Sequence, residues 1–186
     1  MTTWHDTLLA REETKISERQ LGRKIGSMKL AEDLLQARFG KAIGHTLRKI
    51  VASVHVFDTA ALCDVPLCLW LFFDTLPGLR LSGAADGWSL QADDTPPEPI
   101  DLEESGEIIL RDVSHKSAFQ RAMGRALQAA WSVHSSSTGE VIGLRFDFGQ
   151  SITPCVLNWG DELYIAEQYP ADAKKDELRE VPIMPG

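Results

Sequence analysis

The chain has 186 residues, a mass of 20.6 kDa, 44% hydrophobic residues, 25% charged residues and a formal net charge of −8. The apolar content is too high for an intrinsically disordered protein, and three cysteines are too few for a disulfide-rich scaffold. The length suits a single hydrophobic core, or at most two small ones. The acidic balance disfavours nucleic acid as a partner, because the protein and phosphate groups repel each other.

The sequence carries no signal for export or for a membrane. The first residues, Met1 to Asp6, lack the basic cluster and apolar stretch of a secretory signal, so we expect a cytoplasmic protein. The longest apolar run, residues 67–73, is seven residues long, whereas a membrane-spanning helix needs roughly 20. We therefore expect no membrane association, and we interpret this run as a buried strand.

A basic amphipathic helix is predicted near the start of the chain. Apolar residues between positions 17 and 39 recur at intervals of three and four, most of the bases lie off that stripe, and Gly40 follows as expected after a helix. We assign residues 1–40 to this helical segment and residues 41–186 to one α+β domain. The same helix is a candidate surface for association of two copies of the chain.

Beyond the helix, the sequence pattern predicts strands joined by tight turns. Alternation and β-branched residues indicate strands at residues 51–57 and 66–73, and similar strands follow at intervals up to residue 165. Residues 114–130 have helical spacing of apolar residues, and Ser114 is a good N-cap, so we expect a second helix there. The predicted fold is α+β, with an antiparallel sheet of meanders and helices on one face.

The two halves of the domain can be aligned, which suggests an internal pseudo-twofold duplication with repeats at residues 41–92 and 114–167. The alternative is that any two meanders look alike, because alternation and turn glycines recur in all of them. The matching pairs, at an offset of 73 positions, are Leu71 with Leu144, Phe73 with Phe146, Asp74 with Asp147, Leu79 with Ile152, Gly87 with Gly160 and Leu90 with Leu163.

No cofactor or metal site is indicated by the sequence. The chain has no Gly-rich phosphate-binding loop between a strand and a helix, and its five histidines never fall at metal-ligand spacing with a cysteine or another histidine. We interpret Cys63, Cys68 and Cys155 as core thiols, because each lies in or beside an apolar segment without a neighbouring base.

An enzymatic alternative rests on residues far apart in sequence. A small hydrolase could combine Cys155 with His55 and His134 on the concave face of the sheet, with Asp74 or Asp147 as the carboxylate. None of these residues lies in a recognisable catalytic motif. The two aspartates also fit a simpler role, because Asp at the end of a strand accepts backbone N–H groups in turns.

Charge is segregated along the chain, and this pattern favours protein binding. Residues 1–50 carry ten bases and six acids, whereas residues 51–110 carry one base and eleven acids. Such runs are usually solvated surface, but a concentrated negative potential also attracts a basic partner and speeds encounter.

We therefore expect a non-catalytic binding module, for example an inhibitor or immunity-type protein that covers the cationic active site of a toxin or nuclease. Trp159, beside the acids Asp161 and Glu162 in a tight turn, is a candidate anchor, because interface hot spots favour Trp. A purely structural role in the hairpin is the alternative. The candidate partner-binding residues are Asp93, Asp94, Asp101, Glu103, Glu104, Trp159, Asp161 and Glu162.

Overall fold

The computed structural model describes residues 32–57, 60–61, 65–160, 162–171, 173 and 178–186. The chain divides into two compact units, residues 1–33 and 34–186, and nearly all of the first lies outside the described residues. Most of the predicted N-terminal helix, and with it the candidate surface for self-association, therefore cannot be compared with the structure. Within the second unit, residues 34–42 are helical, and no described helix has the length and apolar content to cross a membrane.

The first sheet of the second unit is antiparallel, in the order β5-β4-β3-β1-β7-β6, and β2 pairs with the end of β1. Buried and less buried residues alternate in β4, as in a sheet with one face on the core, whereas β1 is buried at five consecutive positions, 50–54. The strands are β1 (Leu47–Phe57), β2 (Ala60–Ala61), β3 (Cys68–Phe73), β4 (Leu79–Gly83), β5 (Leu90–Asp93), β6 (Ile100–Asp101) and β7 (Glu107–Asp112).

The second sheet is also antiparallel, in the order β11-β10-β9-β8-β12. Its central strand β9 lies between β8 and β10 and is buried at Ile142, Gly143, Leu144 and Phe146. The strands are β8 (Ala129–His134), β9 (Val141–Asp147), β10 (Cys155–Trp159), β11 (Glu162–Ala166) and β12 (Arg179–Ile183).

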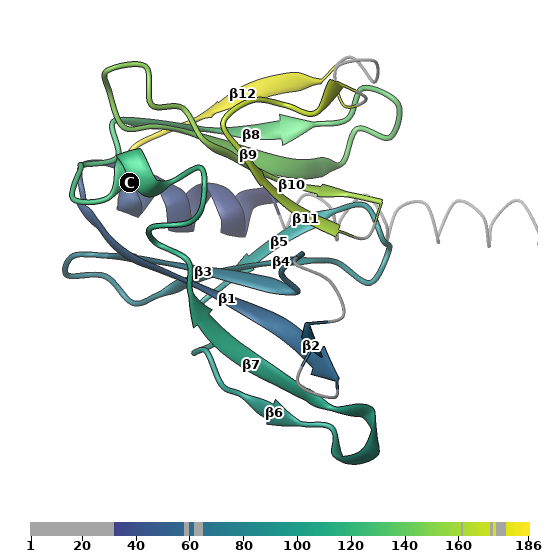
Figure 1. Ribbon diagram of the computed structural model, residues 1–186. Coiled ribbons are helices and arrows are strands. Elements are labelled where there is room, and N and C mark those ends of the chain that lie inside the picture. Colours follow the sequence, from purple (N-terminus) through teal and green to yellow (C-terminus); the bar gives the residue numbers. More distant parts are fainter. Residues whose placement is uncertain (1–31, 58–59, 62–64, 161, 172, 174–177) are drawn as a thin grey trace, which may run out of the picture. The chain divides into compact units, whose positions relative to one another are not determined.

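Both sheets and the helix share one hydrophobic core. Leu35 and Phe39 of the helix pack in the same cluster as Leu71 of β3 and Phe146 of β9, and the Phe39 and Phe146 ring centroids are 5.6 Å apart. Figure 1 shows the helix between the two sheets. The expectation of a single sheet with helices on one face was therefore wrong in detail. Each sheet has an apolar inner face, and the helix packs between these two faces.

The predicted helix at residues 114–130 is not formed. The segment consists of turns and one short 3₁₀ helix, η2 (Gln120–Ala122), and strand β8 begins at Ala129. Four of its apolar residues are buried as the spacing predicted, namely Phe119, Ala122, Leu127 and Ala130, and the Phe119 ring lies 5.4 Å from that of Phe146, but Ala126 is exposed. Gly124 has a φ of 75°, which interrupts a right-handed helix, and the residues after it pair with β9 instead.

The two sheets begin in a similar way. Strands β1, β3, β4 and β5 form one four-stranded meander, and β8, β9, β10 and β11 form another. The segments that lead into them pair with each other: Gly44 N–H donates to Leu127 O at 2.7 Å, and Gly124 N–H donates to Leu47 O at 2.9 Å. Both glycines have positive φ, of 91° and 75°, which allows the chain to bend at equivalent points.

Candidate functional site

The acidic segment at residues 91–107 divides into two parts that differ in their ion pairs. Asp93, on β5, is paired with Arg80 on β4, and Asp94 lies 3.3 Å from the guanidinium of Arg38 on the helix. The chain then crosses the outer face of the first sheet, where Trp70 Nε1 donates to Thr95 O at 2.7 Å. The negative charges of Asp93 and Asp94 are thus balanced within the fold.

We expect Asp93→Asn to lower the free energy of unfolding at neutral pH by about 1–2 kcal/mol, because it leaves Arg80 without its charged partner in a half-buried site. Partial burial opposes ionisation of Asp93, but hydrogen bonds from Arg80 and Thr95 outweigh it and lower its pKa. The stabilisation is therefore complete above the ordinary Asp pKa of about 3.9 and is lost as the pH falls through the lower folded-state pKa. Urea unfolding between pH 7 and pH 3 measures this. A difference that grows toward low pH would contradict it.

The second part of the segment forms what we call the acidic tip: the ribbon of residues 100–107, made by β6, the 3₁₀ helix η1 (Glu103–Ser105) and the start of β7, with Phe57 at the end of β1. Figure 1 shows this ribbon extending away from the rest of the two sheets. Its exposed carboxylates have no ion pair among the described residues, and the sequence has no Lys or Arg between Lys49 and Arg80 or between Arg80 and Arg111. These carboxylates belong to Asp101, Glu103, Glu104 and Glu107.

The backbone of the acidic tip is held by a closed set of hydrogen bonds. Leu102 N–H donates to Gly106 O at 2.8 Å, Glu103 N–H donates to the Asp101 carboxylate at 2.9 Å, and His55 Nε2 donates to Ser105 O at 2.7 Å. Gly106 has a φ of 93°, and a Cβ there would collide with Val56 O, so this turn requires glycine. The carboxylates of the tip are therefore carried on a turn whose backbone is fixed by hydrogen bonds.

Apolar side chains lie beside the carboxylates. Phe57 is 42% exposed and Ile100 is 50% exposed. Ile100 pairs with Ile108, which in turn pairs with His55, so these side chains share the outer face of the sheet with Phe57. An exposed apolar centre surrounded by polar groups is the usual composition of a protein interface.

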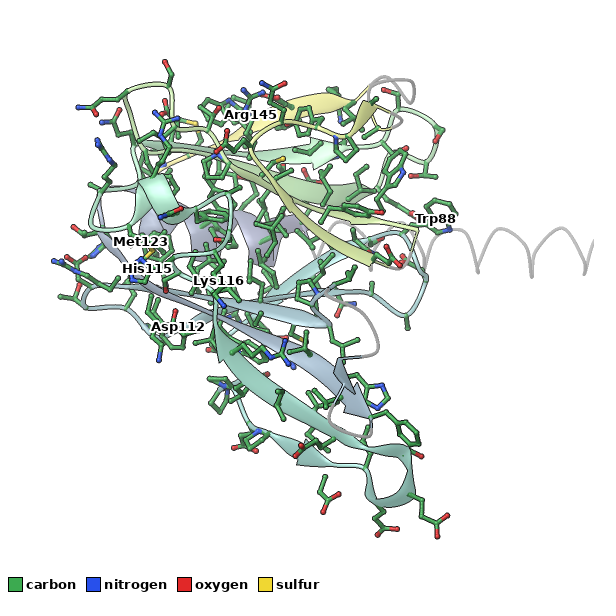
Figure 2. The ribbon with its side chains drawn as sticks, viewed as in Figure 1. Trp88, Asp112, His115, Lys116, Met123 and Arg145 are labelled. Atoms are coloured by element: carbon green, nitrogen blue, oxygen red, sulfur yellow. The ribbon has the colours of Figure 1, made fainter. Side chains whose placement is uncertain are left out.

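The hairpin between β10 and β11 differs from the expected anchor. Trp159 is half-buried and packs against the cluster that contains Val133 and Leu157, Glu162 is exposed, and Asp161 lies outside the described residues. Among the described residues, the exposed tryptophan is instead Trp88, 53% exposed, which follows the turn at Gly87 between β4 and β5 (Figure 2). We missed it in the sequence, although its place directly after an Asp-Gly turn was a usable signal.

The proposed catalytic residues are not brought together. His55 lies on the first sheet, whereas Cys155 and His134 lie on the second. Cys155 is in register with Arg145 and hence with Trp131, three residues before His134, and His134 Nε2 lies 3.0 Å from Ser132 Oγ. The arrangement gives no support to the hydrolase alternative.

The carboxylates of Asp74 and Asp147 both accept hydrogen bonds from backbone N–H groups. The Asp74 carboxylate accepts Thr46 N–H at 2.8 Å, which together with Arg48 lowers its pKa, and the Asp147 carboxylate accepts Gly149 N–H at 2.7 Å. Among the residues that the structure describes, no three His, Cys, Asp or Glu side chains form a group that could hold a metal ion.

Cys155 is expected to be unreactive in the folded protein. It is 1% exposed, its Sγ lies 3.5 Å from Ala166 O, and burial raises its pKa to about 11. At pH 8 only roughly one thiol in a thousand would be ionised, so alkylation by iodoacetamide should be at least about 100-fold slower than in urea. Mass spectrometry of the Cys155 peptide measures this. Equal rates in the folded and unfolded protein would contradict the placement of this thiol in the core.

Several cavities lie outside the acidic tip, among them two that are lined by basic side chains of the second unit. One, of about 440 Å³, is lined by Arg145, which hydrogen-bonds to Glu180 at 2.8 Å and lies over the Tyr169 ring at 5.5 Å. The other, of about 570 Å³, lies between the two sheets beside β7 and β11. Arg145 and Tyr169, which line the first cavity, are both hydrogen-bonded to Glu180, because Tyr169 also donates to Glu180 at 2.8 Å.

No family model, curated protein or solved structure matches this chain.

Proposed function

We propose that this chain is a non-catalytic protein-binding module that contacts a basic partner through the acidic tip. The observation that carries the proposal is the uneven pairing of the acids. Asp74, Asp93 and Asp94 each have a basic partner within the fold, whereas the four carboxylates of the tip have none among the described residues. Carboxylates that a fold leaves unpaired on a projecting ribbon remain available to an external cation.

The tip also has the shape and composition to enter a cationic cleft. Its carboxylates are carried on a narrow ribbon and can occupy positions where a toxin or nuclease would bind phosphate. Phe57 and Ile100 add an apolar surface that becomes buried on contact. We therefore retain an inhibitor or immunity-type role, in the cytoplasm, as the specific form of the proposal.

The test compares two variants with equal changes in charge. E103Q/E104Q/E107Q removes three of the four negative charges of the tip and retains Asp101, whose carboxylate holds the turn, and E98Q/E162Q/E167Q removes three exposed acids outside the tip. A basic partner captured by crosslinking to the wild-type protein is purified, and its association is measured by stopped flow. We expect the tip variant to associate about 10- to 100-fold more slowly, because it loses the attraction that steers encounter, and the control to change little.

The Phe57→Ala variant tests the contribution of the apolar contact to binding without changing the charge of the tip. Because the truncation removes buried area without altering charge, it should speed dissociation and leave the association rate almost unchanged. If both triple variants slow association equally, net charge and not the tip is responsible. If neither does, the proposed function is wrong.

We also propose that the two meanders descend from an internal duplication. Three features support this proposal: the shared strand order, the paired hydrogen bonds at Gly44 and Gly124, and the turn glycines Gly87 and Gly160, both with positive φ. Leu90 and Leu163 follow these turns and are both buried. A duplicated origin would explain why only one copy carries the added ribbon β6-β7.

A further inference from the structure

The cavity between the two sheets has an apolar lining. Ala52 and Val54 of β1 form one side, and Leu163 and Ile165 of β11 form the other, with Val113 after the end of β7. The volume of about 570 Å³ is within the range of roughly 300–1,000 Å³ that small-molecule sites occupy. The cavity is partly open to solvent.

Two cationic side chains line the same cavity. Arg111 pairs with Ala52 across the sheet, so its side chain is on the inner face of β7, and in Figure 2 Lys116 lies between the two sheets, just after β7. Both are exposed, and neither has an ion pair among the described residues. Two unpaired cations beside an apolar surface are complementary to an anion that carries an apolar body.

The one acidic residue that lines the cavity, Asp112, is hydrogen-bonded to Ser114. Asp112 pairs with Val51 and so lies on the opposite face of β7 from Arg111. Its carboxylate accepts Ser114 N–H at 3.0 Å, and hydrogen bonding to Ser114, with smaller contributions from Lys49 and His115, lowers its pKa. Asp112 therefore leaves the charges of Arg111 and Lys116 uncompensated within the cavity.

We propose that this cavity binds a small amphipathic carboxylate of the medium-chain fatty acid type. The carboxylate contacts Arg111 and Lys116, and the alkyl chain lies on Val54, Val113 and Ile165. This site is separate from the acidic tip and does not depend on the proposed function. It has the opposite charge to the tip, so the two surfaces select different ligands.

The probe is decanoate, titrated below its micellar concentration into the full chain and followed by calorimetry and by methyl NMR of Val54, Val113 and Ile165. Decanol and decyltrimethylammonium have the same chain without the negative charge. We expect decanoate to bind at least tenfold more tightly than either, and affinity to rise roughly fourfold with each added methylene from hexanoate to decanoate. Equal binding of all three head groups would overturn the proposal.

The variant R111Q/K116Q removes the two cations, and R125Q/R179Q removes the half-buried Arg125 and the exposed Arg179 at other places in the second unit. Thermal unfolding first establishes that both variants fold. We expect R111Q/K116Q to weaken decanoate binding by about tenfold or more and R125Q/R179Q to change it less than twofold. An unchanged affinity in R111Q/K116Q would contradict the proposal. Absence of binding, together with a dimer that R111E/K116E dissociates, would instead assign the cavity to a second copy of the chain.

Discussion

Replacing Phe146 with alanine is expected to lower the free energy of unfolding by about 3–5 kcal/mol. Phe146 is fully buried, and its ring centroid lies 5.6 Å from that of Phe39, 5.4 Å from that of Phe119 and 6.4 Å from that of Phe148. It thus joins the helix, the segment before β8 and the second sheet in one cluster. The truncation leaves a cavity that none of these three elements can fill without moving the others.

Urea unfolding monitored by circular dichroism measures this loss. Trp88→Ala is the matched control, because it removes a larger aromatic side chain that is 53% exposed, and we expect a change within about 0.5 kcal/mol. If Phe146→Ala and Trp88→Ala had similar small effects, the two sheets would not share the core described here.

Replacing Gly143 with alanine is expected to cost about 3 kcal/mol, although it adds only one methyl group. Gly143 lies in the middle of β9, opposite Leu157 of β10. A Cβ at this position would collide with Leu157 Cδ2 and lie 2.7 Å from Val156 O, which is backbone and cannot move aside without disrupting the pairing of the two strands. The cost comes from steric overlap at the centre of a sheet.

Gly124→Ala provides the comparison for Gly143→Ala. A Cβ at Gly124 meets no atom within 4 Å, and its φ of 75° makes the added strain purely conformational, about 1–2 kcal/mol. Both variants are measured by thermal and urea unfolding. An effect of Gly143→Ala no larger than that of Gly124→Ala would contradict the close approach of β9 and β10.

The strands could be predicted from the sequence because their signal is local. Alternation at residues 51–57 and the apolar run at 67–73 correspond to β1 and β3, and the turns at Gly87 and Gly160 were found from Gly and its neighbours. How the strands are divided between two sheets depends on contacts between distant segments, and no local pattern carries that information.

The predicted helix at residues 114–130 shows where local spacing is insufficient. Phe119 and Ala122 are buried, so the apolar pattern was meaningful, but a helical period and a series of turns can bury the same residues. The positive φ of Gly124 and the pairing of Ala130 with Phe146 favour turns and a strand over a helix in this segment. Tertiary pairing thus overrides the helical propensity of an Ala-rich segment.

The acidic character of the candidate site could be predicted from the sequence, but the ion pair that each carboxylate forms could not. Asp94 finds Arg38, and Asp93 finds Arg80, because of how the helix and β4 are placed in the fold. The same limitation applies to the tryptophans. Sequence could identify aromatic residues near turns, whereas exposure of Trp88 and partial burial of Trp159 depend on the packing of the hairpins.

The most direct test of the central claim is the ionic-strength dependence of association between this protein and its basic partner. Association rate constants are measured by stopped flow from about 0.01 to 0.5 M salt, where the screening length falls from roughly 30 Å to below 8 Å. We predict a steep decline for the wild type and for E98Q/E162Q/E167Q, and a much shallower one for E103Q/E104Q/E107Q. An equally steep decline for all three proteins would contradict a binding role for the tip.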